Sequence, residues 1–284
     1  MNDSDLNITD HSRDSAGLKY VYPVVSRRAG GVSVGINLNI NNACNWRCIY
    51  CQVPDLKIGA APAIDLNILE IELRGFLSEL LHGDFMQKRV PENSRRINDI
   101  ALSGNGEPTS AKEFCNVIEL ICKLRHELPL PADIKLVVIS NGSLMHREYV
   151  QEGLKLMSQC NGELWFKLDR ASEVGMLLVN NTQQKLEQVR QNLLIATTLC
   201  VTWLQTCWFA IDGSPPSAQD EDRYLVFLSE FITCQSKPQG VLLYTLARPS
   251  MQEEASRLSA LSISQLESFA DRIRSLGFVV KVSA

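Results

Sequence analysis

The chain has 284 residues, of which 45% are hydrophobic and 21% charged, the balance of an ordinary globular protein. Its net charge of −4 gives no general attraction to nucleic acid. The polar start of the chain lacks the apolar segment of a signal peptide, and nine cysteines without such a signal favour a reducing, cytoplasmic location. We expect a disordered tail over residues 1–18 and a single core domain, with a short C-terminal extension, over residues 19–284.

The first predicted element is a strand over residues 34–41. Its apolar residues alternate with a second set, and a period of two is the signature of a strand. The second set is mostly asparagine, so we expect this face of the strand to line a polar cavity. Its members are Gly35, Asn37, Asn39 and Asn41.

Helical and strand patterns then alternate to the end of the chain. Helices are expected within 67–87 and at 110–124, 147–158, 182–196 and 264–277. Strands are expected at 97–102, 134–139, 164–168, 201–209, 241–246 and 278–282. The expected helix caps are Asp65 and the pairs Ser110–Glu113 and Ser264–Glu267.

This alternation predicts an α/β protein. Six strand–helix units joined by right-handed crossovers build a parallel sheet, which here is expected to form a partial (β/α)6 barrel. The uncharged segment 193–211 is long enough to span a membrane, but its threonines and β-favouring second half indicate a helix end followed by a buried strand. We therefore expect no membrane partner. Active sites of such barrels lie at the carboxyl ends of the strands.

Three cysteines, Cys44, Cys48 and Cys51, follow the first predicted strand with the spacing C-x3-C-x2-C. Three thiolates on one loop can bind three irons of a cubane [4Fe–4S] cluster and leave the fourth iron open to a substrate or a cofactor. Structural zinc requires four protein ligands, and no fourth is evident nearby. Three structural cysteines on one loop would be a poor core pattern. Of these alternatives, the spacing favours the cluster.

Polar motifs follow other predicted strands, at the same rim of the barrel. Gly104, Asn105, Gly106 and Glu107 belong to the run SGNGEPT, where glycines permit close backbone approach and the carboxylate suits an ammonium group. An ordinary strand-to-helix turn is the alternative. Later motifs are Ser140–Asn141, which also fits a generic turn, and Lys167 with Asp169, which also fits a buried ion pair. Weaker candidates for contacting a substrate are Gln205, Thr206, Tyr244 and Arg248.

The cysteine triplet and the Gly-x-Gly-Glu-Pro run resemble the radical S-adenosylmethionine (SAM) superfamily. The stretch SRRAGGVSVGINLN, which starts at Ser26, is similar to a bacterial branch related to the wyosine-tRNA synthases. Two departures stand out. Asn105 replaces the second glycine of the superfamily motif, and no cysteine precedes Cys44, so a second cluster is not supported.

The resemblance implies roles for the motif residues. It implies that the three cysteines hold a [4Fe–4S] cluster, that residues 104–107 hold the amino group of SAM, and that Tyr50 borders its adenine. It further implies that Ser140 and Asn141 contact the ribose or carboxylate of SAM. We predict an ion pair or hydrogen bond from Lys167 to that carboxylate, although many relatives have serine there.

The reaction implied by the resemblance is reductive cleavage of SAM to a 5′-deoxyadenosyl radical, which removes hydrogen from a substrate. The electron would come from a flavodoxin or ferredoxin. Two substrate classes remain open: a nucleoside in tRNA, or a small molecule or peptide. A non-catalytic iron–sulfur redox sensor or binding module is the alternative outside the enzyme class.

Overall fold

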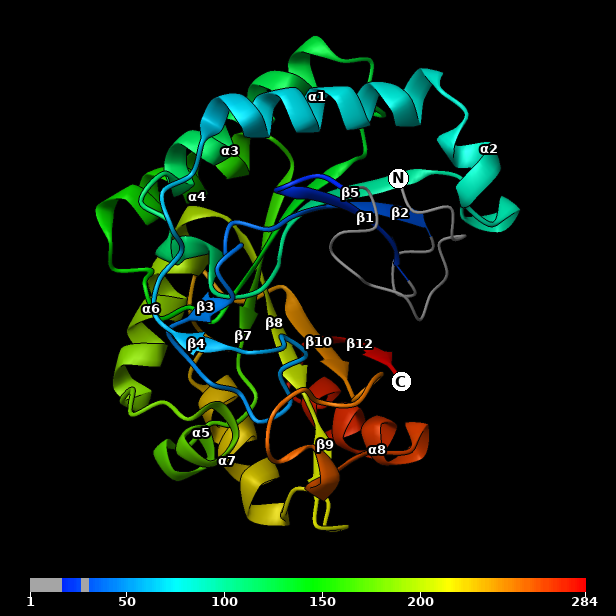
Figure 1. Cartoon of the computed structure of the whole chain (residues 1–284). Helices are drawn as coiled ribbons and strands as arrows, with labels where there is room; N and C mark the ends of the chain where they lie inside the picture. The colour runs from blue at the N-terminus through cyan, green and yellow to red at the C-terminus, as the bar shows by residue number, and fades with distance from the viewer. Residues whose placement is uncertain (1–16, 27–30) are drawn as a thin grey trace.

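The computed structural model describes residues 17–26 and 31–284 (Figure 1). Most of the tail that we predicted to be disordered lies outside the described residues, as do Arg27, Arg28 and Gly30 of the stretch that begins at Ser26.

One curved sheet of eight strands forms the centre of the described chain, in the order β1-β2-β5-β6-β7-β8-β10-β12. All neighbours from β2 to β12 are parallel, and β1 is an antiparallel strand at one edge. The helices lie around the outside of the sheet (Figure 1). The strands are β1 Val21–Ser26, β2 Gly31–Ile36, β5 Ile97–Leu102, β6 Lys135–Ser140, β7 Gly162–Lys167, β8 Val201–Cys207, β10 Gly240–Tyr244 and β12 Val279–Ser283.

Helices connect consecutive parallel strands, so the predicted partial (β/α)6 barrel is confirmed, with β12 as a further parallel strand. Two short pairs lie outside the main sheet: β3 Ala43–Cys44 with β4 Lys57–Ile58, and β9 Phe209–Ile211 with β11 Leu258–Ala260. The helices are α1 Leu66–His82, α2 Phe85–Arg89, α3 Phe114–Glu127, α4 Glu148–Gln159, α5 Glu173–Asn180, α6 Leu186–Leu199, α7 Ala218–Ser229 and α8 Ile263–Arg274. Short 3₁₀ turns are η1 Glu92–Ser94, η2 Pro108–Ser110 and η3 Ala255–Arg257.

The core lies between the sheet and these helices. Helix α3 shows the pattern: Val117, Ile121 and Leu124 recur at helical spacing and are completely buried. Each such side chain contributes about 1.5–3 kcal/mol by leaving water. Cys122 of α3 is bonded to Cys160, after α4, as a disulfide, which the sequence spacing did not predict.

The first predicted strand was wrong in its extent. Strand β2 ends at Ile36, so the asparagines at 37, 39 and 41 belong to the following loop. Their side chains bind backbone groups of that loop, which is the tendency of asparagine that opposes strand continuation. Strand β1 and helices α5 and α7 were not predicted.

One predicted cap is confirmed and two are wrong. Asp65 accepts hydrogen bonds from the amides of Asn67 and Ile68, both at 3.1 Å. Ser110 instead lies in η2, where its hydroxyl donates to the Glu107 carbonyl, and α3 begins later. The box of α8 is Ser262 with Gln265, two residues before the predicted pair.

Segment 193–211 has the predicted structure, the end of α6 followed by β8 and β9. Across residues 17–26 and 31–284, no helix is both long enough and apolar enough to cross a membrane.

Candidate functional site

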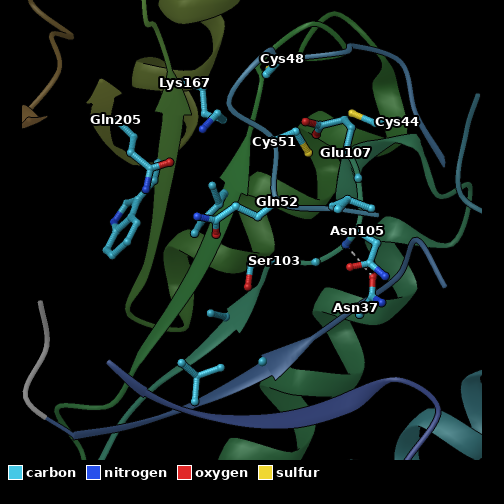
Figure 2. A pocket seen from close by; sticks show the side chains of 18 of the residues that line it. Asn37, Cys44, Cys48, Cys51, Gln52, Ser103, Asn105, Glu107, Lys167 and Gln205 are labelled. Carbon is cyan, nitrogen blue, oxygen red and sulfur yellow. Dashed lines mark hydrogen bonds between the residues drawn. The ribbon is translucent and has the colours of Figure 1, made fainter. Parts of the chain in front are cut away.

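A cavity of about 900 Å³ lies inside the curve of the sheet and extends to the carboxyl ends of its strands. The cysteine loop and the residues that follow β2, β5 and β6 form one part of its wall, and β7, β8 and β10 form the other. Figure 2 shows Glu107 beside Cys44 and Cys51, with Lys167 and Gln205 across the cavity. The predicted motifs therefore border one cavity at the carboxyl ends of the strands.

Cys44, Cys48 and Cys51 all border this cavity as free, half-buried thiols. Segments far along the chain fix their loop. The Ile49 amide donates to the Val179 carbonyl at 2.9 Å, and the Ser250 hydroxyl donates to the Ile49 carbonyl at 2.7 Å. The amide of Met251 adds a bond of 2.8 Å to the Cys51 carbonyl.

The three thiols border one cavity without converging on a single point. Within the described ranges, no three His, Cys, Asp or Glu side chains converge on a point where one metal ion could bind. In a cubane each thiolate binds a different iron, so the sulfurs need not converge. Burial raises the pKa of Cys44 to about 12 and that of Cys48 above its usual range. Such thiols require the positive charge of bound metal to become thiolates.

The glycines of the Gly-Asn-Gly-Glu turn are needed because this turn packs against the cysteine loop. A Cβ on Gly106 would lie under 3.0 Å from the Ala43 carbonyl oxygen, and one on Gly104 would lie as close to the Asn37 side chain. Asn105, which departs from the superfamily motif, donates from its side chain to Asn42 at 2.6 Å. This hydrogen bond, which a glycine side chain could not make, joins the turn to the start of the cysteine loop.

Glu107 is buried, and four groups donate to its carboxylate. They are the Ser140 hydroxyl at 2.6 Å, the Thr109 hydroxyl and amide at 2.5 and 3.1 Å, and the Asn141 amide at 2.6 Å. Burial raises the pKa of Glu107, and the hydrogen bonds from Ser140 and Thr109 oppose that rise. Ser140 thus orients Glu107, while Asn141 both borders the cavity and donates to Asn45 at 2.8 Å.

Lys167 borders the cavity, but its partner is not Asp169. The Lys167 ammonium lies 3.2 Å from the Tyr244 hydroxyl and 5.1 Å from the centre of the Tyr50 ring. Burial alone would lower the pKa of Lys167, but Tyr244 and Asp169 outweigh it and raise that pKa. Asp169 instead accepts a hydrogen bond from the Tyr50 hydroxyl, at 2.6 Å.

Of the four weaker candidates for contacting a substrate, three border the cavity and one does not. Gln205, Tyr244 and Arg248 border the cavity. Thr206 points away from it, since its hydroxyl shares a 2.6 Å hydrogen bond with Tyr224. Gln205 is 3% exposed, and its side-chain oxygen has no hydrogen-bond partner among the described residues.

No family model matches the chain. It is 31% identical over 134 residues to a UPF0026 protein of Helicobacter pylori, a match of 47% of this chain and 38% of that protein. It is 27% identical over 239 residues to a UPF0026 protein of Synechocystis, covering 81% and 76%. It is also 30% identical over 135 residues to the GTPase Obg of Brachyspira hyodysenteriae. That match covers 46% of this chain and 17% of the GTPase. The chain thus spans less than two fifths of the Helicobacter and Brachyspira proteins.

Solved structures resemble most of the chain. TYW1 with a lysine–pyruvate adduct has a TM-score of 0.58 at 14% identity, covering 87% of this chain and 74% of that one. Streptococcus suis SuiB bound to its precursor peptide SuiA has a TM-score of 0.61 at 10% identity. The match covers 90% of this chain and 49% of SuiB. A radical SAM methyltransferase from Sphaerobacter thermophilus gives 0.57 at 12%, covering 89% and 66%. The chain has the radical SAM fold.

Within this radical SAM fold, sequence reasoning missed several residues at the site. Asn45 and Ser143 join the cysteine loop to the loop after β6, with a bond of 2.8 Å between their side chains. Trp165 borders the cavity two residues before Lys167, where strand parity could have indicated it. Asn180, at the end of α5, had no local signal.

Proposed function

We propose that this protein is a radical SAM enzyme. The observation that carries the proposal is one cavity bordered by three free cysteine thiols and by the Gly-Asn-Gly-Glu turn. Cys44, Cys48 and Cys51 would hold a [4Fe–4S] cluster, and the turn would hold the amino group of SAM beside it. When bound, the cluster supplies the electron that cleaves SAM to methionine and a 5′-deoxyadenosyl radical, which removes a hydrogen atom from the substrate.

The protein's part in this reaction is to bind and orient SAM. The donors around Glu107 fix its carboxylate before an ammonium group arrives, which reduces the cost of binding. Lys167 lies across the cavity from Glu107, and its ammonium group suits the SAM carboxylate. Tyr50 is held by Asp169 and offers its ring to the adenine.

The same cavity has room for a substrate. Its volume is near the upper end of the range of about 300–1,000 Å³ that ligand sites occupy. Trp165 and Gln205 border it away from the cysteine loop, and the unpartnered oxygen of Gln205 can accept a hydrogen bond. We propose that these two residues contact the substrate, a tRNA nucleoside, a small molecule or a peptide.

The branch assignment is also a proposal. The stretch that begins at Ser26 supports kinship with the bacterial proteins related to the wyosine-tRNA synthases. The proposal includes one cluster, on Cys44, Cys48 and Cys51. We propose a flavodoxin or ferredoxin as the electron donor. Profiling of metabolites, peptides and tRNA nucleosides in a deletion strain would identify the substrate class.

Anaerobic reconstitution with iron and sulfide tests the proposal. We expect about four irons per chain and, after addition of dithionite and SAM, release of methionine and 5′-deoxyadenosine. Cys48→Ala should abolish this release. Cys115→Ala is the matched control, because Cys115 is also free and half-buried but does not border the cavity. A Cys48→Ala protein that still forms 5′-deoxyadenosine would contradict the proposal.

A further inference from the structure

Asn180 ends helix α5, 132 residues along the chain from Cys48, yet the two side chains meet. The side-chain nitrogen of Asn180 lies 3.2 Å from the Cys48 sulfur and 2.7 Å from a carboxylate oxygen of Asp169. Asn180 is only 1% exposed, so water does not compete for these bonds. The amide therefore bridges a cysteine of the cavity wall and a buried carboxylate.

The orientation of this amide follows from its partners. An ionised carboxylate can only accept, so Asp169 requires the nitrogen of Asn180, and not its oxygen, to face it. The same oxygen of Asp169 accepts the Tyr50 hydroxyl at 2.6 Å, and its other oxygen accepts the Cys207 amide at 2.9 Å. With one N–H of Asn180 bound to this fixed carboxylate, its second N–H is directed at the sulfur of Cys48.

The backbone at the end of α5 holds the same loop. The Ile49 amide donates to the Val179 carbonyl at 2.9 Å. The Arg47 amide donates to the Asn180 carbonyl at 3.3 Å. The helix stops there because Asn181 adopts a left-handed conformation, with a φ of 49°. The end of α5 thus keeps a fixed position relative to Cys48.

We propose that Asn180 is a positioning residue whose hydrogen bond to the Cys48 sulfur raises the reduction potential of the bound cluster. The inference rests on the proposed function. Reduction adds negative charge to the cluster and its sulfurs, and an N–H directed at a ligand sulfur stabilises that charge. Asp169 and Tyr50 serve this bond indirectly, by fixing the amide.

A redox titration followed by electron paramagnetic resonance tests the inference without measuring turnover. Asn180→Leu keeps the size of the side chain and removes its donors, and Asn180→Ala removes most of the side chain. At a fixed applied potential we expect both variants to show about a three- to tenfold lower ratio of reduced to oxidised cluster, a shift of up to about 59 mV. Val174→Ala is the control, because the Val174 side chain is exposed on the same helix and its loss leaves the Asn180 donor in place; its potential should match that of the unaltered protein.

A second measurement detects the bond directly. Protein labelled with ¹⁵N in its asparagine side chains should show a ¹⁵N coupling to the reduced cluster in the absence of SAM, and Asn180→Leu should remove the coupling, which assigns it to Asn180 rather than to Asn45 beside Cys44. An Asn180→Leu protein with a full iron content and an unchanged potential would overturn the inference, as would a labelled protein without the coupling. Failure of the proposed function is distinct, because the unaltered protein would then assemble no cluster that cleaves SAM.

Discussion

Gly106→Ala tests how closely the Gly-Asn-Gly-Glu turn packs on the cysteine loop. The added Cβ would lie under 3.0 Å from the Ala43 carbonyl oxygen and 2.7 Å from the side-chain nitrogen of Asn39. The obstruction is backbone, which cannot rotate away. The 2.8 Å hydrogen bond between these two neighbours of Gly106 would also be displaced.

The structure gives a magnitude for this change. Overpacking costs about 1–3 kcal/mol and a lost hydrogen bond about 0.5–1.5 kcal/mol, so the free energy of unfolding should fall by about 1.5–4.5 kcal/mol. Because the turn and the loop would separate, we also expect Gly106→Ala to retain less iron after reconstitution. Urea denaturation and iron analysis measure the two effects.

Gly75→Ala is the matched control. Gly75 lies on the exposed side of α1, and a Cβ there would meet no atom within 4 Å. The helix should gain about 0.5–1 kcal/mol from the better helix former. If Gly106→Ala unfolded at the same urea concentration as the unaltered protein and bound as much iron, the argument from close packing would be refuted.

Four further substitutions test separate parts of the site. Glu107→Gln keeps the shape of the side chain but loses its charge, so SAM affinity measured by calorimetry should fall about tenfold to a hundredfold, and unchanged affinity would exclude Glu107 as the ammonium ligand. Tyr50→Phe removes a buried donor from Asp169, so urea denaturation should show a loss of about 1–3 kcal/mol in unfolding free energy; a loss below 0.5 kcal/mol would contradict that role. Gln205→Leu removes an unpartnered buried oxygen and should raise the melting temperature, whereas Thr206→Val breaks the bond to Tyr224 and should lower it. If Gln205→Leu melted at a lower temperature than Thr206→Val, Gln205 would be wrongly assigned to the cavity side of β8 and Thr206 to the opposite side.

Local signals predicted the parts of the protein that depend on local interactions. Strand β5 coincides with the predicted range because its apolar residues, Ile97, Ile100, Ala101 and Leu102, directly precede the turn residues of the Ser-Gly-Asn-Gly run. The cysteine triplet and the Gly-Asn-Gly-Glu turn were evident because each places its groups within a few residues. Their shared cavity also followed from the sequence, since parallel strands bring their carboxyl ends to one rim.

Long-range contacts account for what sequence reasoning missed. Ser110 looked like a helix cap, but its hydroxyl serves the Glu107 carbonyl and the Ala61 amide, and no local pattern reveals the second of these. Asn180 is a similar case, because its role depends on a sulfur 132 residues away. Thr206 was grouped with Gln205 although adjacent residues of a strand face opposite sides, an error that the strand period could have prevented.

Ser250 and Met251, which hydrogen-bond the cysteine loop, are synthesised long after the cysteines themselves. These contacts join residues about 200 positions apart. At about 5–20 residues per second, the ribosome makes Ser250 and Met251 about 10–40 s after the cysteines. Throughout that interval the cysteine loop lacks its contacts with Ser250 and Met251. Iron delivery that waits for the finished polypeptide would meet a binding loop already in its final shape.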